Sequence, residues 1–233
     1  PLRVQSPTAR TQVEFTLSEG GVPTYRVLYR NKVVLDDAPL GLDLGRNNKL
    51  GHGMTVQGSS SEDHDSRVTL TVGKTRQARD HYRQLRVQLV DAAQHRLEIE
   101  LRAYDDGVAL RYVLPKAGKL EIRNELTSFA FPRDYPCWTL NLGRFGTSHE
   151  GEYDAIAASK LRPHNLLELP LVCQTDAQGT TLAIGEANLR DYAGLYLTGR
   201  ADGGLGVSAK LSPRLDQPAL AVSICLLYTS DAA

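Results

Sequence analysis

The stretch HRLEIELRAYDDGVALRYVL, residues 95–114, decides the fold class of this chain. Apolar and polar side chains alternate on both sides of the central Asp-Asp-Gly, so each half has the period of two that is typical of a half-buried strand. An Asp-Gly pair between two such runs is a strong signal for a tight hairpin. The stretch therefore predicts two antiparallel strands joined by a turn near Gly107.

The same alternation recurs on both sides of this hairpin. It is found in TQVEFTL (11–17), YRVLYRN (25–31), RVTLTV (67–72) and LRVQLVD (85–91). Clusters of Gly, Pro, Asn and Asp separate these runs, and the long helical segments of βαβ units are missing from the pattern. We therefore expect one all-β domain over residues 1–222, an antiparallel sandwich with few short helices.

Composition excludes several classes of partner. Lys+Arg and Asp+Glu both number 27, so no basic excess is present to attract nucleic acid. No apolar run approaches the roughly 20 residues of a membrane span. The cysteines Cys137, Cys173 and Cys225 form no CxxC pair, which disfavours zinc and thioredoxin-type sites, and we interpret them as separate buried thiols.

The last residues of the chain do not continue the pattern of strands and turns. A predicted strand ends near Val222, and residues 223–233 follow without a turn or a cap. This tail resembles translated sequencing-adapter read-through, so we interpret it as non-native and leave it out of the fold prediction. The alternative is a genuine short C-terminal strand.

Acidic and aromatic residues near predicted strand ends are the remaining candidates for function. Aromatic rings stack on the apolar faces of sugars, and carboxylates accept hydroxyl protons or bind hard cations. In an all-β domain this combination indicates a sugar or calcium site. The candidates are Asp105, Asp106, Trp138, Glu150, Glu152, Tyr153, Glu186, Asp191 and Tyr192.

From residue 20 onward the sequence resembles the N-terminal domain of glycoside hydrolase family 97. The resemblance runs through GGVPTYRVLYRNKVVLDDAPLGLDL (20–44), FPRDYPCWTLNLGRFGTSHEGEYD (131–154) and LELPLVCQTDAQGTTLAIGEANLRDYAGLYL (167–197). The order and spacing of several motifs agree, and HEGEY followed by EANLRDY is the more specific pair.

The resemblance implies a galactose-mutarotase-like β-super-sandwich that precedes a catalytic (β/α)8 barrel. Family members are periplasmic or secreted, exo-acting and calcium-dependent α-glycosidases, either α-glucosidases or α-galactosidases. The chain would be the accessory N-terminal domain, inactive alone, with no catalytic residue of its own. Residue 1 is a proline, so we expect that any signal peptide has been removed or lies outside this sequence.

The resemblance also assigns site residues. Glu186 is the implied calcium ligand, completed by barrel residues and water, and Glu150 and Tyr153 are the implied substrate-binding residues. We expect the Glu186 carboxylate to point out of the domain near both, with Glu150 as the second candidate ligand. The alternative for Glu186 is a cap on a short helical turn, since helix starts favour acids.

The implied partners are an α-linked glucoside or galactoside oligosaccharide and the barrel of the same protein; no nucleic acid and no membrane span are expected. The barrel would cover an apolar face made by LLELPLV (166–172) and YAGLYL (192–197).

One alternative function is a free-standing carbohydrate-binding sandwich with a stacking platform of Trp138, Tyr153 and Tyr192. Another is a mutarotase-like epimerase that uses His149 and Glu186.

Overall fold

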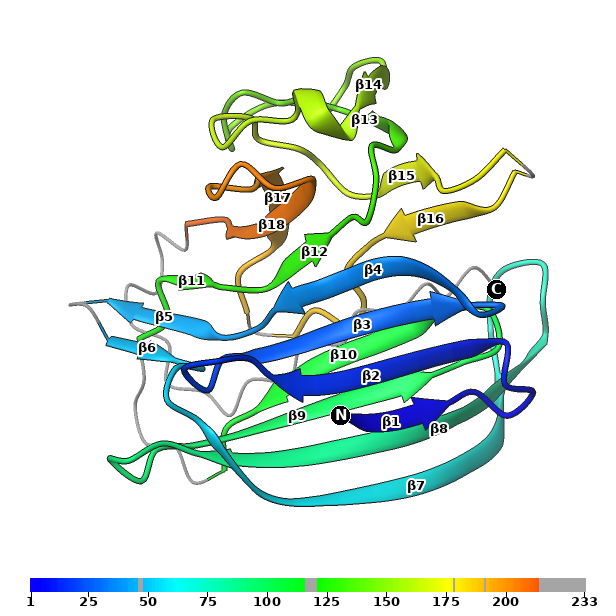
Figure 1. The fold of residues 1–233 in the computed structure, drawn as a ribbon. Coiled ribbons are helices and arrows are strands. Elements are labelled where there is room, and N and C mark those ends of the chain that lie inside the picture. Colours follow the sequence, from blue (N-terminus) through cyan, green and yellow to red (C-terminus); the bar gives the residue numbers. More distant parts are fainter. Residues whose placement is uncertain (46–47, 116–120, 178, 191, 214–233) are drawn as a thin grey trace.

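The structure is a computed structural model that describes residues 1–45, 48–115, 121–177, 179–190 and 192–213. In these ranges the chain forms strands β1 to β18, and the single helical piece is the 3-10 turn η1, Ala158–Lys160. Every strand pairing in them is antiparallel. The all-β, antiparallel prediction is confirmed (Figure 1).

The first sheet is a meander with the strand order β1-β2-β3-β4. Side chains alternate between its two faces, so that Val13 and Phe15 of β2 are buried while their neighbours are partly or largely exposed. This is the pattern that the alternating sequence predicts. The strand bounds are β1 Leu2–Gln5, β2 Thr11–Leu17, β3 Pro23–Tyr29 and β4 Lys32–Pro39.

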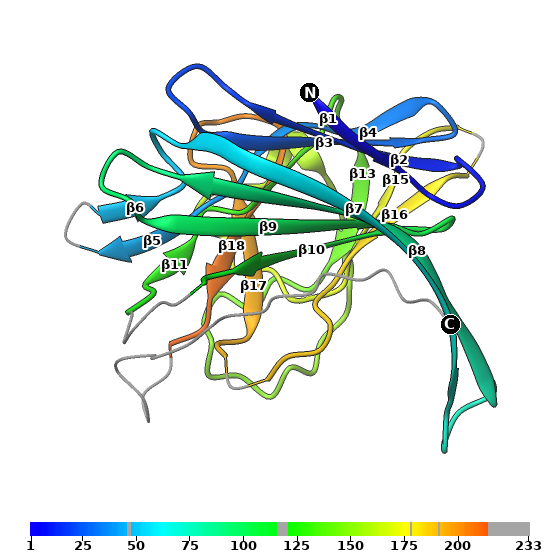
Figure 2. The ribbon, with the colours of Figure 1, turned by 90° about the horizontal axis from the view of Figure 1, so that it is seen from below.

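The second sheet has the order β10-β9-β8-β7. Strands β9 and β10 form the hairpin that the opening stretch predicts, with Val108 opposite Ala103. Figure 2 shows the far end of the β7–β8 hairpin extending away from the other strands. The bounds are β7 Thr55–Thr69, β8 Gln77–Val90, β9 Arg96–Ala103 and β10 Val108–Val113.

The core lies between these two sheets, which stack face to face in Figure 1. Phe15 of β2 and Ile99 of β9 belong to one buried cluster, and both are almost fully excluded from solvent. Burial of a large apolar side chain stabilises the fold by about 1.5–3 kcal/mol. The strand alternation predicted from sequence therefore supplies the main stabilising contacts of the sandwich.

Three smaller sheets lie beside this sandwich, with the orders β11-β5-β6, β12-β18-β17 and β14-β13-β15-β16 (Figure 1). At the start of β18, Gly206 has a positive φ, and a Cβ there would clash with the carbonyl oxygen of Phe129. The bounds are β5 Leu42–Gly45, β6 Asn48–Leu50, β11 Asn124–Glu125, β12 Ser128–Ala130, β13 Pro136–Thr139, β14 Asp154–Ala157, β15 Leu171–Gln174, β16 Thr181–Ile184, β17 Leu195–Gly199 and β18 Gly206–Leu211.

The prediction that LLELPLV (166–172) and YAGLYL (192–197) form an exposed apolar docking face is wrong. Leu167 and Leu171 of LLELPLV and Leu197 of YAGLYL are fully buried, because they pack into the core of the domain itself. The exposed large apolar side chains lie elsewhere, chiefly on the β7–β8 hairpin and on the β13–β14 side. They are Val56, Val68, Leu70, Val72, Trp138, Tyr153 and Leu189.

No helix in the described ranges is long and apolar enough to span a membrane. The tail at residues 223–233 and the boundary at 222 lie outside the described residues.

Candidate functional site

A pocket of about 270 Å³ opens where the segment before β15, the segment after β16 and the start of β17 meet. The segments adjoin because Leu167 and Leu197 exchange backbone hydrogen bonds of 2.8 and 3.0 Å. We call it the glutamate pocket, after the two carboxylates in its lining. Its lining residues are Glu168, Leu169, Glu186, Gly194, Leu195 and Tyr196.

Glu186 lies in this pocket as a half-buried carboxylate. Its Oε2 accepts a hydrogen bond of 3.2 Å from the backbone N–H of Leu195, whereas its Oε1 is buried and has no hydrogen-bond partner. Burial raises the pKa of the Glu186 carboxyl, and the bond from Leu195 offsets this only in part. A buried acceptor without a donor is unfavourable, so a ligand that binds Oε1 would relieve this cost.

These contacts correct two expectations for Glu186. The carboxylate does not project freely from the domain, because Oε1 is buried. It also does not cap a helical turn, since residues 187–190 contain none and its one hydrogen bond comes from the start of β17.

Glu168 is the residue that the sequence analysis missed. Its Oε1 lies 2.7 Å from Nδ1 of His149, so a loop residue nineteen positions earlier is held at the pocket. A carboxylate inside the apolar run LLELPLV was the available signal, because an acid within an otherwise apolar run is unusual for a buried segment. The backbone N–H of Glu168 donates to Leu140, which fixes the segment beside β13.

Tyr196 forms the aromatic wall of the glutamate pocket. Its ring meets Phe145 edge to face at a centroid distance of 5.1 Å, and the His149 ring lies 6.2 Å away. Burial raises the pKa of the Tyr196 hydroxyl, and the negative charges of Glu168 and Glu186 raise it further. The pocket therefore joins two carboxylates and an aromatic face, and the His149 imidazole contacts one of these carboxylates from the neighbouring loop.

Glu150 and Tyr153 do not line this pocket. Both lie in the exposed loop before β14, and the Tyr153 side chain is 46% exposed. In the described part of the chain, neither side chain forms a hydrogen bond or an ion pair with Glu186. Their role in substrate binding stays a prediction.

The three-residue stacking platform is not formed. Trp138 and Tyr153 are 39% and 46% exposed, but Tyr192 is only 7% exposed. The Tyr192 hydroxyl donates a hydrogen bond of 3.1 Å to Oε1 of the buried Glu125, so this ring belongs to the interior. Sequence position alone does not distinguish a buried tyrosine that reaches a polar partner from an exposed one.

The other candidates are dispersed. Asp105 accepts hydrogen bonds from the backbone and hydroxyl of Thr8 at 2.9 and 2.6 Å, which is a structural role. Asp106 and Glu152 are exposed, and Asp191 lies outside the described residues. The imidazole of His149 contacts Glu168 rather than Glu186, so the pair proposed for an epimerase is not brought together by a hydrogen bond.

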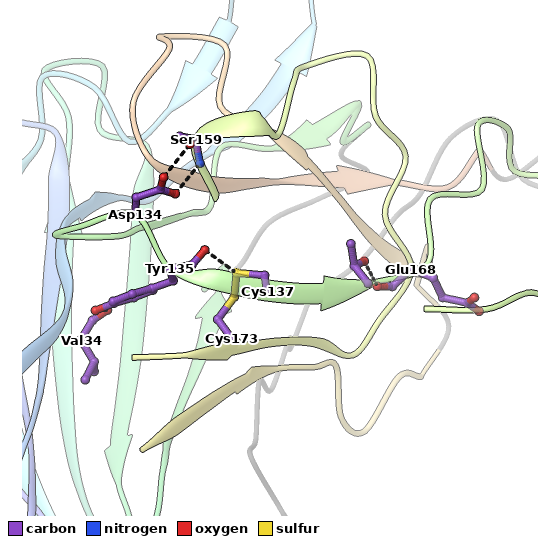
Figure 3. The surroundings of a disulfide bond; sticks show 8 residues. Val34, Asp134, Tyr135, Cys137, Ser159, Glu168 and Cys173 are labelled. Atoms are coloured by element: carbon purple, nitrogen blue, oxygen red, sulfur yellow. Dashed lines mark hydrogen bonds between the residues drawn. A yellow bond between two sulfur atoms is a disulfide. The ribbon is translucent and has the colours of Figure 1, made fainter. Parts of the chain in front are cut away.

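The interpretation of Cys137 and Cys173 as separate thiols is wrong. The two residues face each other on β13 and β15 and form a disulfide, with their Cα atoms 4.0 Å apart (Figure 3). Both are fully buried. The bond spans 36 positions and closes the segment that carries His149 and Glu168. Cys225 lies outside the described residues.

The chain alone does not form a complete metal site in its described residues, since no group of three or more His, Cys, Asp or Glu side chains is close enough to bind an ion. Calcium takes about six to eight oxygen ligands, so Glu186 would supply only part of a site. Its buried, unpartnered oxygen is a hard donor that suits calcium.

A family model described as "Glycosyl-hydrolase 97 N-terminal" matches residues 4–218, which is most of the chain. A retaining alpha-galactosidase of Bacteroides thetaiotaomicron is 26% identical over 192 residues, covering 78% of this chain and 28% of the relative. A probable retaining alpha-galactosidase of Streptomyces bingchenggensis is 28% identical over 200 residues, covering 86% and 29%.

Solved structures share the fold. A glycoside hydrolase family 97 enzyme from Pseudoalteromonas sp. strain K8, in complex with panose, aligns with a TM-score of 0.86 at 21% identity over 97% of this chain and 34% of that chain. A beta-arabinopyranosidase aligns with a TM-score of 0.83 at 21% identity, over 97% and 39%. The chain spans less than a third of the length of the two curated relatives.

Proposed function

The chain belongs to the glycosyl-hydrolase 97 N-terminal family, and from that premise we propose that it is the accessory domain of a calcium-dependent, exo-acting α-glycosidase. In this proposal the sandwich packs on a catalytic (β/α)8 barrel of the same protein. The acid and the nucleophile or base of glycoside hydrolysis would both come from that barrel. This domain would position one edge of the calcium and substrate site.

The observation that carries this proposal is the unpartnered Oε1 of Glu186 in the glutamate pocket. A calcium ion supplied at a domain interface would satisfy this oxygen and favour the ionised carboxylate. Glu150 is the alternative ligand, since it lies in an exposed loop where a facing domain can reach it. The calcium would hold a substrate hydroxyl and neutralise charge beside the bond to be cleaved.

The substrate class in the proposal is an α-linked galactoside or glucoside oligosaccharide. The two curated relatives are named alpha-galactosidases, and a structural neighbour was solved with panose. Glu150 and Tyr153 would contact the sugar from this domain, where Tyr153 offers an exposed aromatic face.

We place the protein in the periplasm or outside the cell. The Cys137–Cys173 disulfide supports this location, because such bonds persist in oxidising compartments and are rare in the cytosol.

A free-standing carbohydrate-binding sandwich is the second candidate function. The exposed rings of Trp138 and Tyr153 favour it, because exposed aromatic side chains stack on sugars. Titration of the purified chain with α-galactoside and α-glucoside oligosaccharides separates the two functions. Binding by the chain alone that Trp138→Ala abolishes would support the binding module over the accessory domain.

The main test uses the intact enzyme that contains this domain. Glu186→Gln keeps the shape but removes the charge, and we expect it to raise the calcium concentration for half-maximal activity by about tenfold. Calcium should also stabilise the intact enzyme against heat, and this stabilisation should weaken in the same variant. Glu19→Gln, in the turn before β3, is the matched control and should change neither quantity.

Wild-type calcium dependence in Glu186→Gln, by both measurements, contradicts Glu186 as the ligand. A shifted dependence in Glu150→Gln in its place would assign the role to the exposed loop. Unchanged dependence in both variants would contradict the proposal that this domain contributes to the calcium site.

A further inference from the structure

The outer end of the β7–β8 hairpin is a ribbon of two strands that leaves the second sheet. Strand β9 pairs with β8 over residues 83–90, so residues 77–82 of β8 pair with β7 alone in the described chain. Figure 2 shows this end reaching away from the other strands. A two-stranded ribbon is only marginally stable in water, so a further surface packed against it would stabilise it.

The ribbon also carries the open edge of the second sheet. In the described part of the chain, β7 pairs with β8 alone. The N–H of Leu70 donates to Arg76 at 2.9 Å, which directs the backbone of Leu70 toward β8. Because backbone groups alternate in direction along a strand, the odd-numbered residues from 59 to 69 present their N–H and C=O groups outward. Such an edge is a template for pairing with another chain.

The ribbon exposes apolar side chains beside this edge. Val68 and Leu70 are 47% and 37% exposed, and Val72, in the turn between the strands, is 82% exposed. Val68 lies on the same face of β7 as His64, whose ring stacks on Tyr82 at a centroid distance of 4.7 Å. Exposed apolar groups next to an open edge favour association with another protein surface.

The charges along this edge complement themselves in one antiparallel register. A two-fold axis through Ser66 would place Asp65 of each copy opposite Arg67 of the other copy, so the favourable pair occurs twice. An axis through Asp65 or Arg67 would set that residue against itself. An axis through His64 would oppose Asp63 to Asp65. The axis through Ser66 is therefore the one of these four that avoids like charges.

The same register covers the exposed apolar side chains. It places Val68 opposite His64 of the second copy, so the valine extends the stacked row of His64 and Tyr82 across the interface. Leu70 would lie opposite Glu62, and no residue from 62 to 70 would meet a like charge directly. Charge and apolar contact therefore favour one and the same register.

We propose that the β7 edge pairs with the β7 edge of a second copy of this chain, antiparallel about a two-fold axis at Ser66. The two ribbons then form one four-stranded ribbon in the order β8-β7-β7-β8. Backbone hydrogen bonds would run from Asp63 and Asp65 to Thr69 and Arg67 of the other copy. The interface is independent of the calcium site, because the glutamate pocket contains no residue of β7 or β8.

A cysteine on the proposed axis tests the register. The two copies of Ser66 would form a non-hydrogen-bonded pair with Cα atoms about 4.5 Å apart, a distance that a disulfide spans. Under mild oxidation, Ser66→Cys in a Cys225→Ala background should convert most of the full chain to a disulfide-linked dimer. Ser60→Cys is the matched control on the same face of β7. It should stay monomeric on a non-reducing gel, because Ser60 would lie opposite Val72.

Reversal of one charge tests the complementarity. Arg67→Asp would set Asp65 against a second carboxylate, twice in the dimer, and should raise the dissociation constant by about tenfold or more in sedimentation equilibrium. Arg96→Asp is the control, since this exposed arginine pairs with Val90 at the other end of β8. It should leave the constant unchanged. In wild type, the amides of the outward residues should exchange more slowly as protein concentration rises.

Three results would overturn the proposal. The first is a full chain that stays monomeric at the highest concentration measured, and the second is equal cross-linking of Ser66→Cys and Ser60→Cys. The third is cross-linking of the chain alone that disappears in the intact enzyme, which would assign the β7 edge to another domain of the same protein. Enzymatic activity enters none of these measurements, so failure here is distinct from failure of the proposed function.

Discussion

The Nδ1 atom of His149 lies 2.7 Å from Oε1 of Glu168, and this contact joins an exposed loop to the rim of the glutamate pocket. His149 itself has a left-handed backbone, with φ at 58°, so the loop turns sharply at the residue that makes the contact. This hydrogen bond thus connects the HEGEY motif to one of the two pocket carboxylates.

We predict that His149→Ala releases this loop. Amides in residues 143–153 should exchange faster, with a stability loss of up to about 1 kcal/mol because the pair is only partly buried. Glu168→Gln should have a smaller effect, since its side-chain oxygen still accepts the bond. The exposed His164, changed to Ala, is the control, and equal exchange in His149→Ala and His164→Ala would contradict the role of the contact.

We predict that the Cys137–Cys173 disulfide is a major source of stability. Because the bond spans 36 positions, its loss in a Cys137→Ala, Cys173→Ala double variant should lower the free energy of unfolding by about 4 kcal/mol, as measured in urea. Unfolded, unreduced wild-type protein should show one free thiol. A titration that finds three would refute the bond.

We predict that Tyr192→Phe destabilises the domain by about 1.5–3 kcal/mol, because it removes a hydrogen bond to the buried carboxylate of Glu125. Thermal or urea unfolding measures the change. Tyr153→Phe removes the same atom from an exposed ring and should stay within about 0.5 kcal/mol of wild type. Equal stability of the two variants would place Tyr192 at the surface.

We predict that Glu186→Gln, in calcium-free buffer, raises the stability of the chain at neutral pH. The pKa of Glu186 is raised by burial in the folded chain, so the ionised carboxylate destabilises the fold above that pKa. This cost falls as pH drops through the folded pKa and is absent below about pH 4, where the group is protonated in both states. Melting curves of both proteins from pH 4 to pH 8 should therefore converge at the acid end. A constant difference across that range would be inconsistent with the burial argument.

We predict that deletion of residues 223–233 leaves thermal stability nearly unchanged, because the tail is interpreted as non-native. A loss of more than about 2 kcal/mol, the scale of one buried core side chain, would show that the tail packs as a real strand.

The sequence pattern was sufficient to predict strands that bury one face, because their period of two follows from that burial. The alternation in residues 95–114 predicted the β9–β10 hairpin, and its Asp-Gly turn lies between these strands as expected. Similar runs predicted β2, β3 and β8. This works because a strand with one buried face must repeat every two residues, whatever its partner is.

In residues 151–163 the local sequence pattern does not determine the structure. The segment contains β14 and a three-residue turn, η1, because pairing with β13 overrides a weak local helical pattern. The Asp134 carboxylate accepts bonds from the N–H and hydroxyl of Ser159 at 2.7 and 2.6 Å, which holds that turn in place (Figure 3).

The sequence by itself determined the fold class, the family and the identity of Glu186 as a candidate, because periods and motif order are properties of the linear chain. Only the tertiary structure decided which residues meet. It placed Glu168, which contacts His149, in one pocket with Glu186. It also paired Cys137 with Cys173 and turned Tyr192 into the interior. Each of these contacts joins side chains from segments whose spacing is set by sheet pairing, and no local pattern encodes the distance between two strand ends.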